Sequence, residues 1–215
     1  ELEVELDPLQ REAVEMALCN QTSILTGGAG CGKTTTVRFI IGVMEKLSKI
    51  CRISGVEIAL AAPTGMAAKR MKASTGKEAK TIHKLIEYNP ALPALTLNED
   101  NPLPYDFVIV DELSMVDIDT MAMLLRAVCS DTQLLLLGDV NQLPSIGPGE
   151  VLHDMINSGI FQVTALKRSF RHGARRTILD NANRVLEGST ELDFGHSDCV
   201  FYNVPDSSDD KNCNR

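Results

Sequence analysis

Short runs of apolar residues alternate along the chain with longer segments of helical periodicity. The apolar runs occupy residues 22–26, 57–62, 107–110 and 133–138. Runs of this length that are apolar at nearly every position are typical of strands buried on both faces. Strands of this kind separated by helices predict an α/β fold, with a parallel sheet that helices cover on both faces.

The first helix is predicted to begin at the sequence DPLQ. Asp7 is a favourable N-cap, and Pro8 suits the first helical turn. Ala13 and Ala17 belong to the apolar stripe of this helix. Gln10 lies on the same stripe, so that a polar amide stands on an otherwise apolar helix face.

Residues 86–105 interrupt the alternation of strands and helices. They hold four prolines and show little helical periodicity, which indicates a small hairpin-like insertion. Helical patterns resume after the last strong strand, and the polar residues at the end of the chain are expected to be poorly ordered. We therefore predict one domain over residues 1–190, which contains the insertion, and a C-terminal segment over residues 191–215.

Composition limits the kind of protein. The chain has 215 residues, of which 44% are hydrophobic, enough for one domain with a substantial core. No apolar stretch approaches the roughly 20 residues that cross a bilayer, and the first residues lack the basic start of a secretory signal. The six cysteines form no CxxC pair, so reduced thiols are expected rather than disulfides or a zinc site. We expect a cytoplasmic protein with no membrane partner.

The formal charge of −8 does not suggest a nucleic-acid-binding protein. Positive charge is nevertheless concentrated in two stretches. Residues 69–84 contain six basic residues and one acidic residue, Glu78, and residues 161–179 contain five basic residues and no acidic one. Two interpretations stay open at this point, a local surface that contacts phosphates or solvated helix faces. The basic residues are Lys69, Arg70, Lys72, Lys77, Lys80 and Lys84 in the first stretch, and Lys167, Arg168, Arg171, Arg175 and Arg176 in the second.

The sequence GGAGCGKT follows the first predicted strand and precedes a helical segment, which is the context of a phosphate-binding loop (Walker A). Its glycines allow backbone N–H groups to surround phosphates, Lys33 supplies a positive charge to the β and γ phosphates, and Thr34 supplies a hydroxyl ligand for Mg²⁺. We therefore predict ATP and Mg²⁺ as cofactors. The predicted nucleotide contacts in this segment are Gly27, Gly28, Ala29, Gly30, Cys31, Gly32, Lys33, Thr34 and Thr35.

Two more loops carry polar residues directly after predicted strands. Asp111 and Glu112 follow the run at 107–110 (Walker B); Asp111 is predicted to hold Mg²⁺, and Glu112 to accept the proton of the attacking water. Gln142 follows the run at 133–138, where an amide can contact the γ-phosphate or orient water. Either loop alone would also fit ordinary turn chemistry. Together with the phosphate loop, they predict an ATP hydrolase.

The motifs, taken in order, resemble those of the RecD-like, 5′-to-3′ branch of superfamily 1 DNA helicases, the group that includes exodeoxyribonuclease V alpha-type subunits. The strings that carry the resemblance are LDPLQREAV, GGAGCGKTTT, APTGMAAKRM, TIHKL, VIVDELSM, GDVNQLPSIGPG and ALKRSFRH, and they extend over residues 5–190 approximately. The resemblance implies the first RecA-like P-loop motor domain of an ATP-dependent helicase that works in DNA recombination and repair.

The resemblance also assigns roles to single residues. It implies that Gln10 contacts adenine and that Arg171 reaches the γ-phosphate and supports the transition state. It places Pro63, Thr64, Thr81 and His83 along a channel for single-stranded DNA, next to Lys69 and Arg70. A buried structural role for His83 is the alternative. In relatives, a hairpin at the position of residues 86–105 separates DNA strands.

Two residues depart from the family pattern. His172 stands where glutamine is usual after the FR pair, and Met66 stands where a basic residue is common after APTG. The expected partners are single-stranded DNA, a second RecA-like domain outside this chain, and nuclease or helicase subunits of an exonuclease complex. We expect the 215 residues alone to be weakly active or inactive. Alternative functions are a P-loop ATPase that is not a motor, and a nucleotide-dependent DNA-binding module without turnover.

Overall fold

The computed structural model describes residues 5–51, 55–92, 95–167, 176–195 and 199–202. The chain forms two compact units, Glu1–Phe170 and Arg171–Arg215. The predicted first domain, residues 1–190, includes the whole first unit and the helix of the second. No helix in the described part of the chain is both long enough and apolar enough to span a bilayer.

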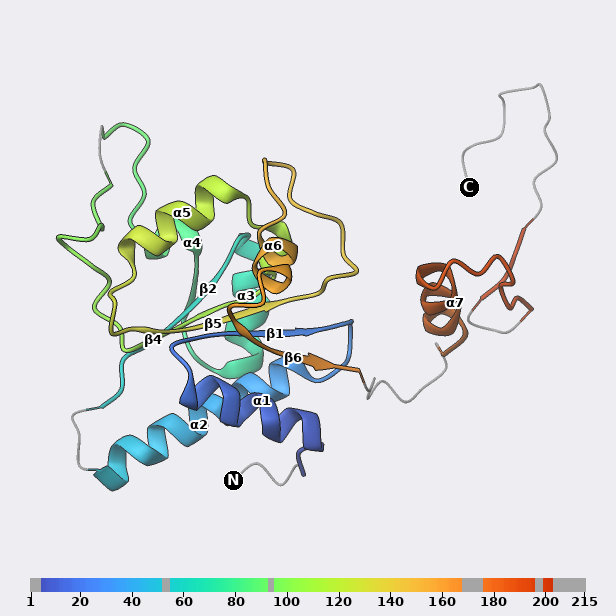
Figure 1. The fold of residues 1–215 in the computed structure, drawn as a ribbon, viewed down its shortest axis with the longest axis horizontal. Coiled ribbons are helices and arrows are strands. Elements are labelled where there is room, and N and C mark those ends of the chain that lie inside the picture. The colour runs from blue at the N-terminus through green and yellow to red at the C-terminus, as the bar shows by residue number, and fades with distance from the viewer. Residues whose placement is uncertain (1–4, 52–54, 93–94, 168–175, 196–198, 203–215) are drawn as a thin grey trace. The chain divides into compact units, whose positions relative to one another are not determined.

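The first unit is built on a six-stranded sheet in which every neighbouring pair is parallel (Figure 1). The spatial order is β3-β2-β4-β5-β1-β6, so β5 lies between β1 and β4. The predicted parallel α/β fold is therefore confirmed. The strands are β1 (Thr22–Gly27), β2 (Ile58–Ala62), β3 (Ala79–Thr81), β4 (Phe107–Val110), β5 (Gln133–Gly138) and β6 (Gln162–Leu166).

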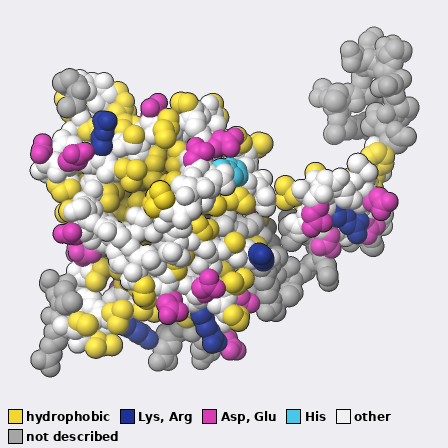
Figure 2. Space-filling model, in the orientation of Figure 1, with side chains coloured by type: hydrophobic (Ala, Val, Ile, Leu, Met, Phe, Trp, Pro, Cys, Tyr) yellow, Lys and Arg dark blue, Asp and Glu magenta, His cyan; other side chains and the backbone are white. Residues whose placement is uncertain are grey.

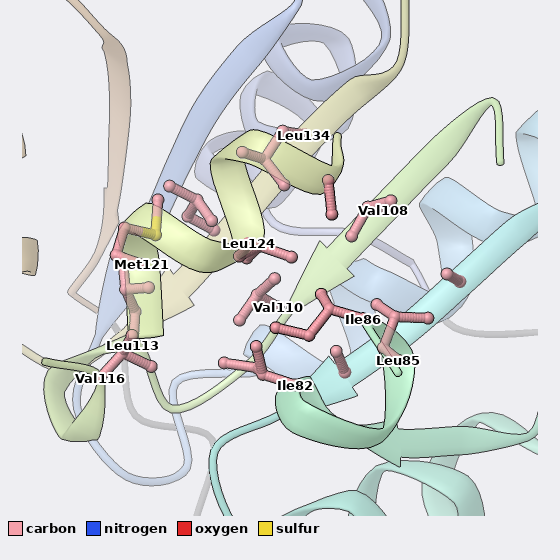
Figure 3. Close-up of a cluster of buried hydrophobic side chains, with 14 of the residues drawn as sticks. Ile82, Leu85, Ile86, Val108, Val110, Leu113, Val116, Met121, Leu124 and Leu134 are labelled. Carbon is pink, nitrogen blue, oxygen red and sulfur yellow. The ribbon is translucent and has the colours of Figure 1, made fainter. Parts of the chain in front are cut away.

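Helices cover both faces of the sheet, and alternate residues of each inner strand point to opposite faces. Phe107 and Ile109 of β4 pack with α1, α2 and α3, whereas Val108 and Val110 pack with α4, α5 and α6. Figure 3 shows part of the second of these two clusters. The helices are α1 (Pro8–Cys19), α2 (Lys33–Cys51), α3 (Gly65–Thr75), α4 (Ile82–Leu85), α5 (Ile118–Ala127), α6 (Val151–Asn157) and the 3₁₀ turn η1 (Leu113–Met115), with α7 (Arg176–Leu186) in the second unit.

The start of α1 agrees with its prediction. Asp7 is the N-cap, and Pro8 is the first helical residue. The Asp7 carboxylate accepts a hydrogen bond from the backbone N–H of Leu9 at 3.0 Å, and the side chain of Gln10 accepts one from the backbone N–H of Asp7 at 3.0 Å. The Gln10 side-chain contact and a hydrogen bond from the Gln10 backbone N–H to the Asp7 side chain form a capping box, which satisfies backbone N–H groups at the start of the helix.

The predicted insertion contacts α5 through residues of its second half. Leu97 and Leu103 are buried in the cluster on that face of the sheet, and the N–H of Leu103 donates to the carbonyl oxygen of Ala127 at 2.7 Å. One antiparallel bridge joins Asn98 and Asn101. The insertion is thus anchored to the core at its second half, and its role as a strand-separating pin stays a prediction.

Candidate active site

The phosphate loop connects β1 to α2 and begins the longest helix described here. Gly30 and Gly32 have φ angles of 81° and 87°, in the left-handed region that side chains with a Cβ rarely adopt. These two turns bring the loop around the amino end of α2, where backbone N–H groups and the helix dipole favour an anion. The geometry fits the phosphates of a nucleotide.

Lys33 is the first residue of α2, and its side chain lies over the loop. Its Nζ donates hydrogen bonds to the carbonyl oxygen of Gly27 and, at 3.3 Å, to that of Gly28. Thr34, the predicted Mg²⁺ ligand, is exposed, and the hydroxyl of Thr36 bonds the carbonyl oxygen of Gly32 at 3.1 Å. Lys33 and Thr34 therefore place a cation and an exposed hydroxyl at consecutive positions at the start of α2.

Asp111 and Glu112 leave β4 at its carboxyl end. The N–H of Asp111 donates to the carbonyl oxygen of Ala61 in β2 at 2.9 Å, which ties the pair to the sheet. Glu112 has a φ of 57°, an uncommon left-handed conformation for a residue other than glycine, and its N–H donates to Asp111 Oδ1 at 2.8 Å. The turn thus fixes the backbone of Glu112 against the Asp111 carboxylate.

The pKa values of both carboxyl groups are raised. Burial is the largest cause for Asp111, opposed by the hydrogen bond from Glu112 N–H and by the charge of Lys33. Burial and the charge of Asp111 raise the pKa of Glu112, while Lys33, a hydrogen bond from Gln142 and the charge of Arg70 lower it. Because Lys33 acts on both groups, the phosphate loop and the acidic pair form one electrostatic site.

This site has oxygen atoms that can serve as ligands for Mg²⁺. A buried carboxylate beside a second carboxylate is stabilised in its charged form by a nearby cation. Mg²⁺ is commonly held by one or two protein oxygens together with substrate phosphates and water, and Thr34 and Asp111 offer two such oxygens. Within the described ranges, no group of three or more His, Cys, Asp or Glu side chains is arranged to hold a metal by itself.

The loop after β5 brings a third set of side chains to the same edge. The Gln142 side chain is close enough to Glu112 to lower the pKa of that carboxyl, and Gln142 Oε1 accepts a hydrogen bond from the Ser114 hydroxyl at 3.3 Å. Asp139 is buried, and its Oδ2 lies 4.0 Å from the position that a Cβ on Gly28 would take. The loop thus contacts the acidic pair at one end and the phosphate loop at the other.

Two contacts hold this loop in place, and sequence patterns gave no signal for either. The ring nitrogen Nε2 of His153 in α6 is 3.0 Å from the carbonyl oxygen of Val140. At the far end, the carbonyl oxygen of Pro148 accepts a hydrogen bond from Ile118 N–H at 2.9 Å, and Gly147 leaves room for Asp117, whose Oδ2 would lie 2.2 Å from a Cβ there. The loop therefore joins α6, the active site and the start of α5.

The residues predicted to contact DNA gather at the carboxyl ends of β2 and β3. Ala62 and Thr81 are register partners in these strands, so Pro63 and Thr64 lie beside Thr81. The Thr64 hydroxyl caps α3 by accepting from Ala67 N–H at 3.2 Å, and the Thr81 hydroxyl caps α4 by accepting from Lys84 N–H at 3.2 Å. His83 is partly buried. The fold thus brings these residues together, and their contact with DNA stays a prediction.

The basic stretch around α3 divides into paired and unpaired side chains. Lys72 forms an ion pair with Glu78, and Lys77 forms one with Glu45 at 2.6 Å. Lys69 and Arg70 are exposed, and a guanidinium nitrogen of Arg70 lies 3.7 Å from the Met66 sulfur. In the view of Figure 2, apolar atoms gather over α5, and charged side chains lie toward the margins.

Two predicted site residues need separate comment. Gln10 is buried, and its capping contact with Asp7 gives the amide a structural role that the sequence prediction missed. The capping-box spacing, Asp7 followed three residues later by Gln10, was the available signal. Arg171 and the departure His172 lie outside the described residues.

Comparison with known proteins identifies the family. The AAA domain family matches residues 10–148. The RecBCD enzyme subunit RecD of Mycolicibacterium smegmatis is 36% identical over 201 residues, which cover 85% of this chain and 36% of that protein. The ATP-dependent RecD2 DNA helicase of Deinococcus radiodurans is 35% identical over 179 residues, 83% of this chain and 24% of that protein. The chain thus spans 36% or less of the length of these two relatives.

Solved structures agree on the fold. A structure of Pif1 helicases at forked double-stranded DNA has a TM-score of 0.58 and 21% identity, covering 85% of this chain and 48% of that one. The Pif1 helicase of Candida albicans gives the same TM-score and identity, with 85% and 44% covered. At this identity the likeness concerns the fold alone.

The chain belongs to the AAA domain family, the class of nucleotide-binding protein that its phosphate loop and parallel sheet define. Within that class it is a homologue of the RecD and RecD2 proteins. The resemblance of its motifs to RecD-like superfamily 1 helicases is therefore confirmed.

Proposed function

We propose that this chain is the ATP-binding motor domain of a DNA helicase of the RecD type, which couples ATP hydrolysis to movement along single-stranded DNA in the 5′-to-3′ direction. The observation that carries the proposal is the convergence of Lys33, the Asp111–Glu112 pair and Gln142 at one edge of the sheet. Membership of the RecD-like group supplies the link to DNA, recombination and repair.

The chemistry follows from where each side chain lies. Lys33 and the N–H groups of the phosphate loop bind the β and γ phosphates. Thr34 and Asp111 would hold Mg²⁺, which would supply positive charge to the phosphates when bound. Glu112 accepts the proton of the attacking water; its raised pKa makes it a stronger base than an exposed glutamate. Gln142 lies beside Glu112, where its amide can contact the γ-phosphate or orient the attacking water, and the predicted roles of Gln10 and Arg171 complete the site.

The proposed DNA surface is the neighbouring edge formed by Pro63, Thr64, Thr81 and His83, with the exposed cations Lys69 and Arg70 beside it. Arg70 lowers the pKa of Glu112, so the DNA surface and the hydrolytic site lie within electrostatic reach of each other. That proximity supports a motor, because in a motor the state of the nucleotide site must change the affinity of the DNA surface, and the reverse.

The remaining parts of the proposal concern the whole protein. A second RecA-like domain would close the cleft over the γ-phosphate, and nuclease or helicase subunits of an exonuclease complex are proposed partners, as the name of the RecD relative suggests. The cytoplasmic location is part of the same proposal, since it rests on work in recombination and repair.

The test is a steady-state ATPase assay with and without single-stranded DNA, together with displacement of streptavidin from either end of a biotinylated strand. The motor proposal expects strong stimulation by single strands and displacement from the 3′ end. Hydrolysis indifferent to DNA would instead indicate an ATPase that is not a motor. Nucleotide-dependent DNA binding without turnover would indicate a binding module.

A further inference from the structure

An aromatic pair lies at the end of α4, on the edge of the proposed DNA surface. The rings of His83 and Tyr88 meet edge to face, with centroids 5.3 Å apart and planes inclined at 64°. Tyr88 is 41% exposed. Among phenylalanines and tyrosines in the described part of the first unit, it alone is classed as exposed, since Phe107 is buried and the others are partly buried. In the described part of the first unit, Tyr88 is therefore the aromatic side chain available at the surface.

The pair has a fixed support. Ile82, Leu85 and Ile86 are almost completely buried in the cluster under α5, and Figure 3 shows all three side chains in that cluster. These three residues hold α4 against the core. The remaining positions, His83 and Lys84, are therefore turned away from the sheet with little freedom for the helix to rotate.

A tight turn brings Tyr88 back over His83. Glu87 has a φ of 52°, a left-handed conformation that is unfavourable for a residue with a Cβ. The N–H of Tyr88 then donates to the carbonyl oxygen of His83 at 2.9 Å. The turn thus holds the Tyr88 ring against His83 while leaving 41% of the residue exposed, so that part of the ring is available to a ligand.

The surroundings of the ring define the ligand chemistry. Thr81 is the N-cap of α4, and the exposed cations Lys80 and Lys84 lie one residue before it and three residues after it in the chain. Pro63 and Thr64 follow the neighbouring strand. An aromatic face next to cations is the arrangement by which proteins hold single-stranded nucleic acid, since the cations contact phosphates while the ring stacks on a base.

We propose that Tyr88 stacks on one unpaired base of a single DNA strand, with His83 supporting the ring from its edge. The inference rests on the proposed function and adds to it a residue that contacts bases rather than phosphates. Stacking of this kind tolerates every base, because each has a π face, and it suits a protein that moves along DNA of any sequence.

The experiment compares two probes of equal length, an oligothymidylate and the same backbone without bases. Affinities are measured for the protein and for its Tyr88→Ala, Tyr88→Phe and Leu92→Ala variants. Loss of one stacked base should weaken oligothymidylate binding by Tyr88→Ala about fivefold or more. Tyr88→Phe should bind like the parent, and none of the variants should change affinity for the abasic strand. Leu92 is an exposed apolar neighbour in the same insertion and serves as the matched control.

The possible outcomes separate this inference from the function on which it rests. Unchanged oligothymidylate binding by Tyr88→Ala would overturn the stacking role while leaving DNA binding intact. Equal loss on both probes would also overturn it, because a base-independent effect means that Tyr88 supports the fold. If the parent binds neither probe with or without nucleotide, the proposed function itself fails, and the stacking role falls with it. Thermal unfolding of each variant shows whether it is folded.

Discussion

At the scale of single residues, Lys33 and Glu112 divide the work of the nucleotide site. Lys33→Ala should abolish hydrolysis and weaken nucleotide binding, because it removes the cation over the loop. Glu112→Gln should keep nucleotide affinity and lower kcat by about 10²- to 10⁴-fold, the usual contribution of a general base. Titration calorimetry with a non-hydrolysable nucleotide and a steady-state ATPase assay measure the two effects. Glu99→Gln, at an exposed position, is the control.

Parental turnover by Lys33→Ala would mean that this loop is not the working site. Equal loss of binding in Lys33→Ala and Glu112→Gln would contradict the separate roles given to the two residues.

His153 acts on Gln142 through the backbone. Its ring bonds the carbonyl oxygen of Val140, two residues before Gln142. His153→Ala should lower kcat by about tenfold or more while KM changes little, since a small displacement of a positioning group is costly in phosphoryl transfer. His153→Gln, which keeps a donor, should recover part of the rate. Asp154→Asn changes an exposed neighbour in α6 and should leave kcat unchanged.

If KM rises by about the same factor as kcat falls, and His153→Gln recovers neither, then His153 supports the fold in general. The residue would then have no positioning role.

Among the helices, α5 has a start that depends on pH. Asp117 caps it by accepting from Thr120 N–H at 2.8 Å, and hydrogen bonds from Thr120 followed by the charge of His83 lower the pKa of Asp117. Because the folded-state pKa is below the unfolded value, the stabilisation is complete above pH about 4 and is lost as pH falls further. Asp117→Ala should cost about 1 kcal/mol of unfolding free energy at pH 7.

Urea unfolding of the parent and of Asp117→Ala, followed from pH 7 downward while both stay folded, measures this effect. The difference between the two should shrink below pH about 4. A difference that stays constant into the acid range would mean that the carboxylate charge does not contribute to the cap.

Elements buried on both faces were the ones that the sequence predicted well. The runs that became β1, β2, β4 and β5 are apolar at successive positions because helices cover both sides of them. The edge strands were missed: β3 has three residues, and β6 alternates buried and exposed positions around Thr164. Edge strands contact fewer neighbours, so their sequences carry a weaker pattern.

The active site was predictable only where its residues follow strands directly. Lys33, Asp111 and Glu112 could be identified because short motifs fix their chemistry and context. The contact between Ser114 and Gln142 joins segments 28 residues apart, and the His153 contact joins a helix to a loop. No local pattern encodes such tertiary contacts. Gln10 is the opposite case, because its capping contact with Asp7 is local and follows from their spacing in the sequence.

At the scale of the whole molecule, an acidic protein must bind DNA through a limited set of cations. Of the basic stretch at residues 69–84, Lys72 and Lys77 form ion pairs, whereas no ion pair is found within the described residues for Lys69, Arg70, Lys80 and Lys84, all of them exposed. Replacing Lys69 and Arg70 with alanine should weaken single-strand binding and reduce the slope of log affinity against log salt by about 1.4, or 0.7 for each lost phosphate contact.

Fluorescence anisotropy of a labelled oligonucleotide over a range of salt concentrations measures this slope. Lys77→Ala removes a cation of the same stretch that is already paired with Glu45, and it should leave the slope unchanged. If the double variant keeps the parental slope, Lys69 and Arg70 belong to a solvated helix face.

The order of strands in the sheet also governs when the nucleotide site can form during synthesis. β1 reaches β4 only through β5, which begins at Gln133. While the ribosome is still making residues before Gln133, the segment that carries Lys33 and the segment that carries Asp111 have no backbone hydrogen bonds linking their strands. Pairing over such a long separation in sequence is slow, and the apolar strands stay exposed until it occurs. The nascent chain is therefore expected to bring Lys33 and Asp111 together only after β5 has been made, so the complete nucleotide site forms late in the synthesis of this unit.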